Sequence, residues 1–347
     1  MEGDLSDRKL LKIKDTKIWI LAFIMIGVIF VLALVLSGKF LTLRNFQSMA
    51  YQFPEFGLLA LAMTIAMITG GIDLSVIATA NLTGIIAAII MTNYVNAENA
   101  GNPAALLFVV LAIIAALVTA AACGLLNGVL ISLVGVPPIL ATLGTMIFYS
   151  GIGMAVTKGI GVVGFPESFL EIGAGKLSLF PIPLLIFIGC ALVISFILNK
   201  TSFGLKLCLV GANPTASLFS GINNKVVIIN TYMITGLLAG ISSIIMISRF
   251  NSAKVGYGDT YLLQAILVAV LGGIDPYGGY GKVSGVVMGI IILQVLQNAF
   301  TLFGFTPYAK GLIWGLMLIL VMIINFVTSR YQERSKILRM KDQGVIE

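Results

Sequence analysis

The chain alternates between long apolar stretches and short polar segments along almost its whole length. Most of the apolar stretches approach or exceed the length of about 20 residues that a helix needs to cross a bilayer. Lipid offers no water to backbone polar groups, so runs of this length predict helices rather than barrel strands. We expect about ten spans, over Ile18–Gly38, Phe46–Thr69, Val76–Met91, Ala104–Val134, Ile139–Val156, Ile182–Leu198, Val226–Ser248, Tyr261–Leu271, Val283–Phe303 and Pro307–Phe326.

These spans divide the chain into three parts. Residues 1–17 form a polar N-terminal tail, residues 18–327 form one transmembrane domain, and residues 328–347 form a polar C-terminal tail. The first apolar run is too long for the core of a signal peptide, so we expect an uncleaved first helix. The predicted fold class is an all-α integral membrane protein with about ten transmembrane helices.

The composition agrees with membrane insertion and excludes other classes. Hydrophobic residues make up 59% of the chain, charged residues make up 10%, and the mean hydropathy is +1.07. A soluble domain carries about 25% charged residues. The net charge of +7 does not indicate nucleic-acid binding, because the basic residues lie at span boundaries and in the two tails rather than on one soluble face.

The residue types needed for catalysis or metal binding do not form a recognisable pattern. The chain contains no histidine, and its three cysteines lack CxxC spacing. The segment GGYGKV at 278–283 has Val283 where a phosphate-binding loop requires Ser or Thr after Lys. We therefore expect no enzyme activity, no cofactor and no metal, and an ATP-driven step would need a separate polypeptide.

The distribution of basic residues predicts the orientation of the chain. With both termini in the cytoplasm, the inner segments hold fourteen Lys and Arg and the outer loops hold six; Lys310, inside a span, completes the 21. This excess follows the positive-inside rule. The outer loops then include 92–103, 157–180 and 249–260, and we expect 157–180 to be flexible. The GxGxxG pattern at 159–164 lacks the strand–helix context of a dinucleotide site.

The spans also contain packing and bending signals. Pro54 and Glu55 lie in the outer part of the second span and predict a bend there. The fourth span is longer than one straight crossing needs, which predicts a tilted or bent helix. Two pairs of glycines have the small-xxx-small spacing that permits close helix packing. These pairs are Gly124 with Gly128 and Gly236 with Gly240.

The segment 204–222, GLKLCLVGANPTASLFSGI, is the longest polar-flanked segment with Gly and Pro between two strongly apolar spans. Asn213 is a good N-cap, Pro214 fits the first helical turn, and Gly221 fits a helix end. We predict a short helix across the cytoplasmic face that docks another protein. Its small outward side chains would be Ala216, Ser217 and Ser220. The alternative is an ordinary polar loop.

Two further motifs stand at the ends of spans. GGIDLS at 70–75 follows the second span, where two glycines break the helix. The tetrapeptide GGID recurs at 272–275, and GGYGK follows at 278–282. The two GGID positions do not correspond under a five-plus-five inverted repeat, so we interpret them as one turn chemistry used twice.

Together these motifs resemble bacterial ABC importer permeases of the ribose, autoinducer-2 and simple-sugar type, within the branched-chain amino acid permease superfamily. The resemblance covers nearly the whole chain: G-x-N-P-x-A-S-x-x-S-G-I at 211–222, GGIDLS at 70–75, and the LGG turn followed by GGxGK up to 282. The chain departs from the family pattern at 261–266, YLLQAI, which lacks the acidic residue that often precedes this short helix.

The resemblance implies a permease subunit that carries a simple sugar or similar polar solute across the cytoplasmic membrane of a bacterium. Its partners would be a cytoplasmic ATP-binding subunit, an extracytoplasmic solute-binding protein that docks on the outer loops, and a second permease subunit, identical or homologous. The family's loop is a coupling helix for the ATPase. This implies a coupling role for Gly211, Asn213, Pro214, Ala216, Ser217, Ser220 and Gly221.

Polar residues within spans are costly in lipid and are therefore candidates for the translocation pathway. Amides and hydroxyls suit a hydroxyl-rich substrate because they can exchange hydrogen bonds. The candidates are Asp73, Ser75, Asn81, Asn127, Gln264, Gln294 and Asn298. The alternative for each is a helix–helix contact or a cap. Asp73 and Asp275 are interpreted as caps at turns, with a coupling-ion role as the alternative.

Three rival functions stay open. The first is a related permease for branched-chain amino acids or nucleosides. The second is an ion-coupled secondary transporter that works without an ATPase, which the scarcity of buried charges disfavours. The third is a non-transporting membrane scaffold, which the broken helices disfavour.

Overall fold

The computed structural model describes residues 19, 21–36, 38–94, 103–178 and 180–342. Its α-helices are α2 (Leu43–Ile68), α3 (Val76–Tyr94), α4 (Pro103–Val129), α5 (Pro138–Thr157), α6 (Glu167–Ala174), α7 (Ile182–Lys200), α8 (Ser202–Ala212), α9 (Pro214–Phe219), α10 (Asn224–Phe250), α11 (Tyr261–Leu271), α12 (Val283–Leu302) and α13 (Pro307–Asp342). The short elements are the π-helix η1 (Leu130–Val134) and the strands β1 (Val162–Val163), β2 (Lys176–Leu177), β3 (Phe180–Pro181) and β4 (Ser252–Ala253). A further apolar helix, Leu21–Val35, precedes α2.

The helices confirm the predicted membrane fold. Within the described residues, eight helices are long and apolar enough to cross a bilayer, and they coincide with eight of the predicted spans. The two other predicted spans are the shorter apolar helices Leu21–Val35 and Tyr261–Leu271. The sequence did not predict α8 as a separate helix. Most of the loop 92–103 lies outside the described residues.

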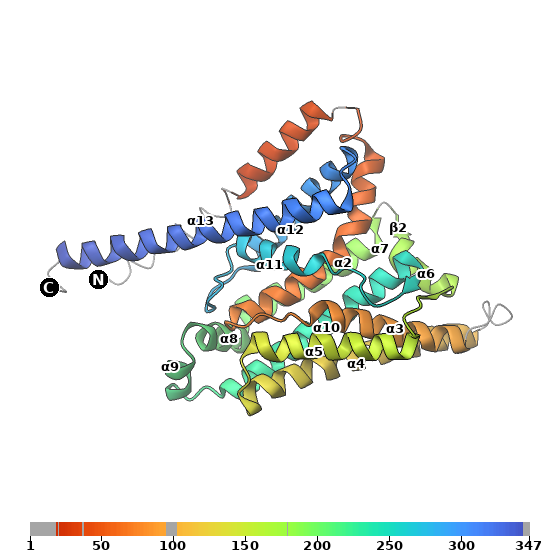
Figure 1. Cartoon of the computed structure of the whole chain (residues 1–347), viewed down its shortest axis with the longest axis horizontal. Coiled ribbons are helices and arrows are strands. Elements are labelled where there is room, and N and C mark those ends of the chain that lie inside the picture. Colours follow the sequence, from red (N-terminus) through yellow and green to blue (C-terminus); the bar gives the residue numbers. More distant parts are fainter. Residues whose placement is uncertain (1–18, 20, 37, 95–102, 179, 343–347) are drawn as a thin grey trace.

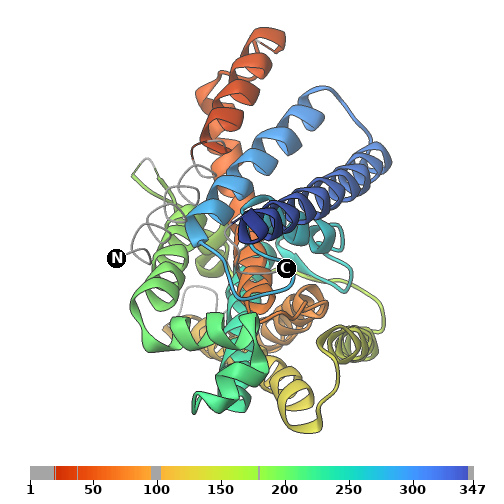
Figure 2. The same ribbon diagram turned by 90° about the vertical axis from the view of Figure 1, so that its left-hand side faces the viewer.

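Most of the long helices run roughly side by side, so the bundle has two ends (Figure 1). We call one the α9 end, where α8 and α9 lie together with the turns 69–75 and 272–282. We call the other the α6 end, where α6 and β2 lie. Figure 2 turns the α9 end toward the viewer. The described part of α13 continues past this end, beyond the predicted span boundary at residue 327.

The core of the bundle is built on α2 and α10. All residues of α2 from Pro54 to Ile68 are buried, and α10 packs against α2, α3 and α4. By contrast, α5, α7 and α13 expose large apolar side chains such as Ile147, Leu192 and Leu312. Such exposed apolar surface suits lipid rather than water. The helix α2 contains Pro54 and changes direction along its length (Figure 1).

The two predicted glycine pairs pack against each other, which confirms their role in close packing. A Cβ atom on Gly124 of α4 would lie 2.1 Å from the carbonyl oxygen of Tyr232 in α10. A Cβ on Gly236 of α10 would lie 2.3 Å from the carbonyl oxygen of Ala120 in α4. The backbones of the two helices therefore touch directly, and only glycine fits between them.

The long fourth span is continuous but irregular. The α-helical hydrogen-bond pattern of α4 changes to that of the π-helix η1 over its last five residues. Gly135 then ends the helix with φ of 84°, a backbone conformation that favours glycine. The expected irregularity of this long helix is thus a π-turn at the α9 end, a feature that often marks functional sites.

The prediction of a flexible loop over 157–180 was wrong, because this segment is folded. It contains α6, and Phe169 of that helix is fully buried. The hydroxyl of Ser248 in α10 donates to the carbonyl of Phe169 at 2.7 Å and accepts from the amide of Gly173 at 2.7 Å. Strand β1 pairs antiparallel with β4, which lies after α10. These long-range contacts hold the segment on the bundle, and they cannot be predicted from the local sequence.

We predict that Gly124→Val lowers the thermal stability of the purified protein in detergent. The added side chain would separate α4 from α10, and overpacking of this kind costs about 1–3 kcal/mol. Gly189→Val in α7 is the matched control, because a Cβ there meets no atom within 4 Å. The measurement is the apparent melting temperature of both variants. Equal melting temperatures would show that the α4–α10 contact does not limit stability.

Candidate functional site

The short helix α9 stands at the end of the bundle with the predicted caps in place. The side-chain oxygen of Asn213 accepts a hydrogen bond from the amide of Ala216 at 2.9 Å, and Pro214 occupies the first position of the helix. Gly221 follows the helix with φ of 78°. These features satisfy the free N–H groups of the first turn and allow the chain to reverse after the last turn.

The outward face of α9 differs from the prediction, because Ser217 points inward. Its side chain is only 3% exposed and donates to the carbonyl of Pro214 or to Asn224 Oδ1, each at 2.9 Å. The most exposed large side chains are instead Leu218 and Phe219, at 61% and 87%. Ala216 and Ser220 are exposed as predicted. The tip of α9 is therefore apolar, whereas the sequence suggested a surface of small residues only.

Four glycines join α9 to the rest of the α9 end. We call Gly70, Gly211, Gly278 and Gly279 the glycine junction. The amide of Gly279 donates to the carbonyl of Ile68, the last residue of α2, at 2.8 Å. A Cβ on Gly211 would lie 1.9 Å from that carbonyl oxygen and 2.6 Å from the amide nitrogen of Gly279. Three backbone segments thus meet at one point: the ends of α2 and α8 and the loop between α11 and α12.

The two GGID turns have the same local chemistry, as the sequence indicated. Asp73 Oδ1 accepts from the amide of Ser75, and Asp275 Oδ1 accepts from the amide of Tyr277, both at 3.0 Å. In each turn the carboxylate bonds the backbone two residues on, which is an Asx turn. The sequence did not reveal that the two turns lie side by side, joined by the glycine junction.

Asp73 also belongs to a buried polar network that connects three helices with the turn before α3. Its carboxylate accepts from the hydroxyls of Ser75 at 2.7 Å and of Thr235 in α10 at 3.1 Å. Asn127 of α4 donates to the Ser75 hydroxyl at 2.7 Å and accepts from Thr145 of α5 at 2.6 Å. The structure thus brings together three of the predicted pathway residues, Asp73, Ser75 and Asn127, with their polar atoms satisfied by one another.

The other predicted pathway residues lie in three different settings. Asn298 exchanges two hydrogen bonds with Asn45, at 3.0 and 2.8 Å, which is the kind of contact that joins helices. Gln264 and Gln294 line a small cavity at the α11–α12 contact, and Gln294 Nε2 has no hydrogen-bond partner among the described residues. Asn81 lines a larger cavity between α3, α5 and α11, and its Oδ1 also has no partner in the part of the chain that the structure describes.

Sequence reasoning missed a buried ion pair. The side chain of Glu55, in α2, is fully buried and is bound by both Arg249 Nε, at 3.0 Å, and Arg249 Nη2. The hydroxyl of Tyr261 donates to the same carboxylate at 3.0 Å. The sequence placed Glu55 near a bend and Arg249 in an outer loop. An acidic residue inside an apolar run was the available signal, because lipid requires that such a charge find a partner.

The fold and the buried polar groups together indicate one class of protein. The described bundle buries polar networks, presents one exposed apolar helix at its end, and brings no group of three or more His, Cys, Asp or Glu side chains together for a metal ion. Buried polar groups within membrane-spanning helices are typical of a membrane transport subunit.

Comparisons with known proteins agree with this class. Residues 45–322 match the family described as "Branched-chain amino acid transport system / permease component". The protein "Autoinducer 2 import system permease protein LsrD" of Escherichia coli K12 is 30% identical over 322 residues, covering 91% of this chain and 94% of the relative. The same protein from Escherichia coli O157:H7 is 31% identical over 287 residues, covering 81% and 83%. No solved structure matches the chain.

The chain therefore belongs to the permease component family of these transport systems. It is the permease subunit of an ABC importer, a multi-pass membrane protein, and not an enzyme. A permease of this kind works with an ATP-binding subunit and a solute-binding protein.

We predict that Arg249→Gln destabilises the protein more than Glu55→Gln does. The first change leaves a fully buried carboxylate without its cation, and loss of one partner from a buried pair costs about 3–5 kcal/mol. The second change leaves Arg249, whose side chain is 21% exposed and can recover some solvation. Thermal unfolding of both variants in detergent measures the difference. The reverse order would contradict the assignment of Glu55 as the more deeply buried charge.

Proposed function

We propose that this permease imports a neutral, hydroxyl-rich solute such as a simple sugar across the cytoplasmic membrane of a bacterium. The ATP-binding subunit would bind α9 on the cytoplasmic side of the membrane. The observation that carries this proposal is the position of α9: its apolar tip is exposed, and the helix α8 that precedes it is held against the bundle by direct backbone contacts at Gly211. Apolar side chains such as Phe219, left exposed at the end of a bundle, are typical of a docking surface.

The glycine junction supports α9 as the coupling helix. Movement of α8 and α9 would reach the end of α2 and the loop between α11 and α12 through backbone atoms. No flexible side chain lies between Gly211 and Ile68 to absorb the displacement. The first GGID turn leads directly into the Asp73 network, so the same displacement would act on α3, α4, α5 and α10. Gly211, Asn213, Pro214, Ala216, Ser217, Ser220 and Gly221 are the proposed coupling residues.

The orientation and the remaining partners follow from this assignment. The α9 end carries Lys206 within α8 and Lys200, Lys225 and Lys282 at the ends of other helices, which supports a cytoplasmic position for it and for both termini. The α6 end would then face outward and receive the solute-binding protein. A second permease subunit, identical or homologous, would complete the importer. The autoinducer 2 import named for the relatives supports import rather than export.

The proposed pathway uses polar groups that the bundle does not fully satisfy. Asn81, Gln264 and Gln294 line cavities and stay candidates for solute contact. Asp73, Ser75 and Asn127 are hydrogen-bonded to one another, and Asn298 is bonded to Asn45. In our proposal these four position helices along the pathway, and their hydrogen bonds exchange with solute only when the helices move.

We predict that Phe219→Asp abolishes both assembly with the ATP-binding subunit and ATP-driven uptake. The exposed side chain contributes nothing to the fold of this chain, so a charge there disrupts only what covers it. The assay combines co-purification of the ATP-binding subunit with solute uptake by proteoliposomes that contain the whole importer. Val163→Asp, a change of similarly exposed apolar surface at the α6 end, is the control for assembly.

Two results would contradict this proposal. The first is normal ATP-driven uptake and assembly by the Phe219→Asp variant. The second is uptake by the purified permease alone when only an ion gradient is applied, which would identify a secondary transporter. Uptake of isoleucine in place of sugars would leave the coupling mechanism intact and replace the solute.

We also predict that the α9 end is cytoplasmic. In a chain whose Cys123, Cys190 and Cys208 are replaced, Leu177→Cys at the α6 end should react with a membrane-impermeant maleimide on intact spheroplasts. Phe219→Cys should react only after permeabilisation. Both positions are exposed, at 68% and 87%, so accessibility within the bundle does not limit either reaction. The opposite labelling pattern would reverse the orientation of the whole chain.

A further inference from the structure

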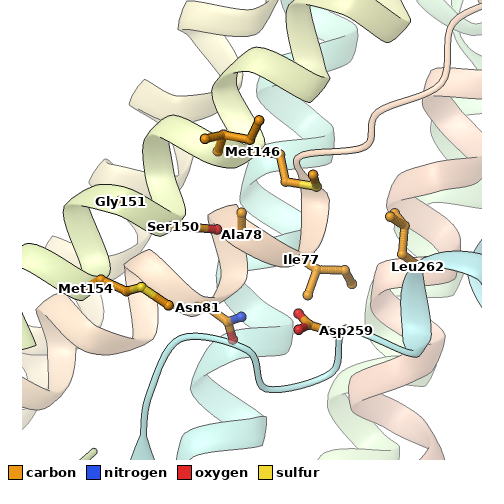
Figure 3. Close-up of a pocket in the computed structure, with 10 residues that line it drawn as sticks. Ile77, Ala78, Asn81, Met146, Ser150, Gly151, Met154, Asp259 and Leu262 are labelled. Carbon is orange, nitrogen blue, oxygen red and sulfur yellow. The ribbon is translucent and has the colours of Figure 1, made fainter. Parts of the chain in front are cut away.

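A cavity of about 520 Å³ lies between α3, α5, α11 and the loop that precedes α11. Its volume falls within the range of about 300–1,000 Å³ that is usual for small-molecule sites. Most of its walls are apolar, formed by side chains such as Ile77, Met146, Met154 and Leu262. Three polar side chains interrupt these walls, namely those of Asn81, Ser150 and Asp259 (Figure 3).

One of these side chains, that of Asn81, has an unpaired atom among the described residues. Asn81 is only 4% exposed, yet its Oδ1 has no hydrogen-bond partner among the described residues. Figure 3 shows its carboxamide directed toward the Asp259 carboxylate, with the Ser150 side chain entering from α5. A buried polar atom without a partner costs about 1–3 kcal/mol, so it persists only where something compensates it. A bound molecule that donates a hydrogen bond would supply this compensation.

The loop before α11 places Asp259 at the wall of this cavity, although the residue itself is exposed. The helix α11 has eleven residues and is therefore about 16 Å long, roughly half the thickness of the hydrocarbon core. Gly256 and Gly258 have φ of 93° and 74°, which lets the loop turn inward. The Asp259 side chain does not cap α11, since the cap position is Thr260 and has no side-chain hydrogen bond. Desolvation at this position raises the pKa of the Asp259 carboxyl.

The chemistry of the lining selects one class of solute. Asn81 Oδ1 and the Asp259 carboxylate are acceptors, and the Ser150 hydroxyl can act either way. A molecule with several O–H donors matches this set, and its C–H faces match the methionine and isoleucine walls. None of the described residues that line the cavity is Lys or Arg, so nothing there would pair the carboxylate of an amino acid. The negative charge of Asp259 also disfavours an anionic solute.

The geometry points to a binding site for a neutral polyhydroxylated solute in this cavity, with Asn81, Ser150 and Asp259 as its hydrogen-bonding residues. This inference rests on the proposed import function and adds a location and a recognition chemistry to it. Along the bundle, the site lies between the α6 end and the Asp73 network near the start of α3. The loop that precedes α11 reaches the site from the α6 end.

The test uses a thiol placed in the cavity of the assembled importer. Gly151 lines the cavity, and a Cβ there meets no atom within 4 Å, so Gly151→Cys adds a reporter without a clash. The native cysteines are replaced, and the reaction rate of the new thiol with a small charged methanethiosulfonate is measured. The probes are D-ribose, D-xylose and erythritol as neutral polyols, and isoleucine as a zwitterion. Uptake of the same probes by the whole importer is measured in parallel.

We expect at least one polyol to slow the reaction and isoleucine to leave it unchanged. Asn81→Leu and Asp259→Leu should each weaken this protection by about fivefold or more, the size expected for a lost hydrogen bond. Asp259→Asn, which keeps an acceptor, should retain part of it. Glu167→Gln is the matched control, because Glu167 is an exposed acid at the start of α6 that does not line the cavity. Normal assembly with the ATP-binding subunit confirms that each variant folds.

The outcomes separate this inference from the proposed function. If polyol uptake persists but polyols protect the thiol equally in all variants, or protect it in none, the cavity is not the solute site and the import function stands. Protection by isoleucine alone would overturn the recognition chemistry. If the complete importer transports none of the polyols, the proposed function fails for this solute class and the inference fails with it.

Discussion

Direct contact between helix backbones at glycine positions is the interaction on which this bundle depends. Lipid is as apolar as a helix surface, so close van der Waals packing must replace the hydrophobic drive that assembles soluble bundles. The α4–α10 crossing uses Gly124 and Gly236 in this way. The α11–α12 contact does the same, since a Cβ on Gly285 would lie 2.1 Å from the carbonyl oxygen of Gly272. The glycine junction extends the principle to the loops of the α9 end.

This kind of contact has a mechanical consequence. Side chains can change rotamer and absorb a displacement, whereas two backbones in contact must move together. The α9 end is built of such contacts, so it is suited to carry a movement of α9 into the membrane in our proposal. The α6 end combines both kinds of contact: a Cβ on Gly173 would lie 2.5 Å from the amide nitrogen of Arg249, and the side chain of Asn251 accepts from the amide of Phe165 at 2.9 Å.

The buried polar groups fall into two sets. One set is satisfied within the protein: the Asp73 network, the Glu55–Arg249–Tyr261 cluster and the Asn45–Asn298 pair. Groups of this set fix helices relative to one another, because breaking any one leaves a costly unpaired atom. The other set has atoms without a partner among the described residues, and two of these four atoms, Asn81 Oδ1 and Gln294 Nε2, belong to residues that line cavities. Asn81 combines an unpaired buried atom with a cavity of suitable size, which is why we locate solute recognition there.

Much of the fold was determined by local sequence. Continuous apolar runs, glycine spacing and the Asn213-Pro214 cap specify helices, their close faces and the start of α9 through interactions within a few residues. The tertiary structure alone decided which groups meet. It folded residues 157–180 onto α10, turned Ser217 inward, paired Glu55 with Arg249 and set the two GGID turns side by side. It also separated Asn81 from the satisfied Asp73 network, although both carried the same signal in the sequence. The physical reason is that a polar residue in a span demands a partner, but the identity of that partner depends on which helices touch.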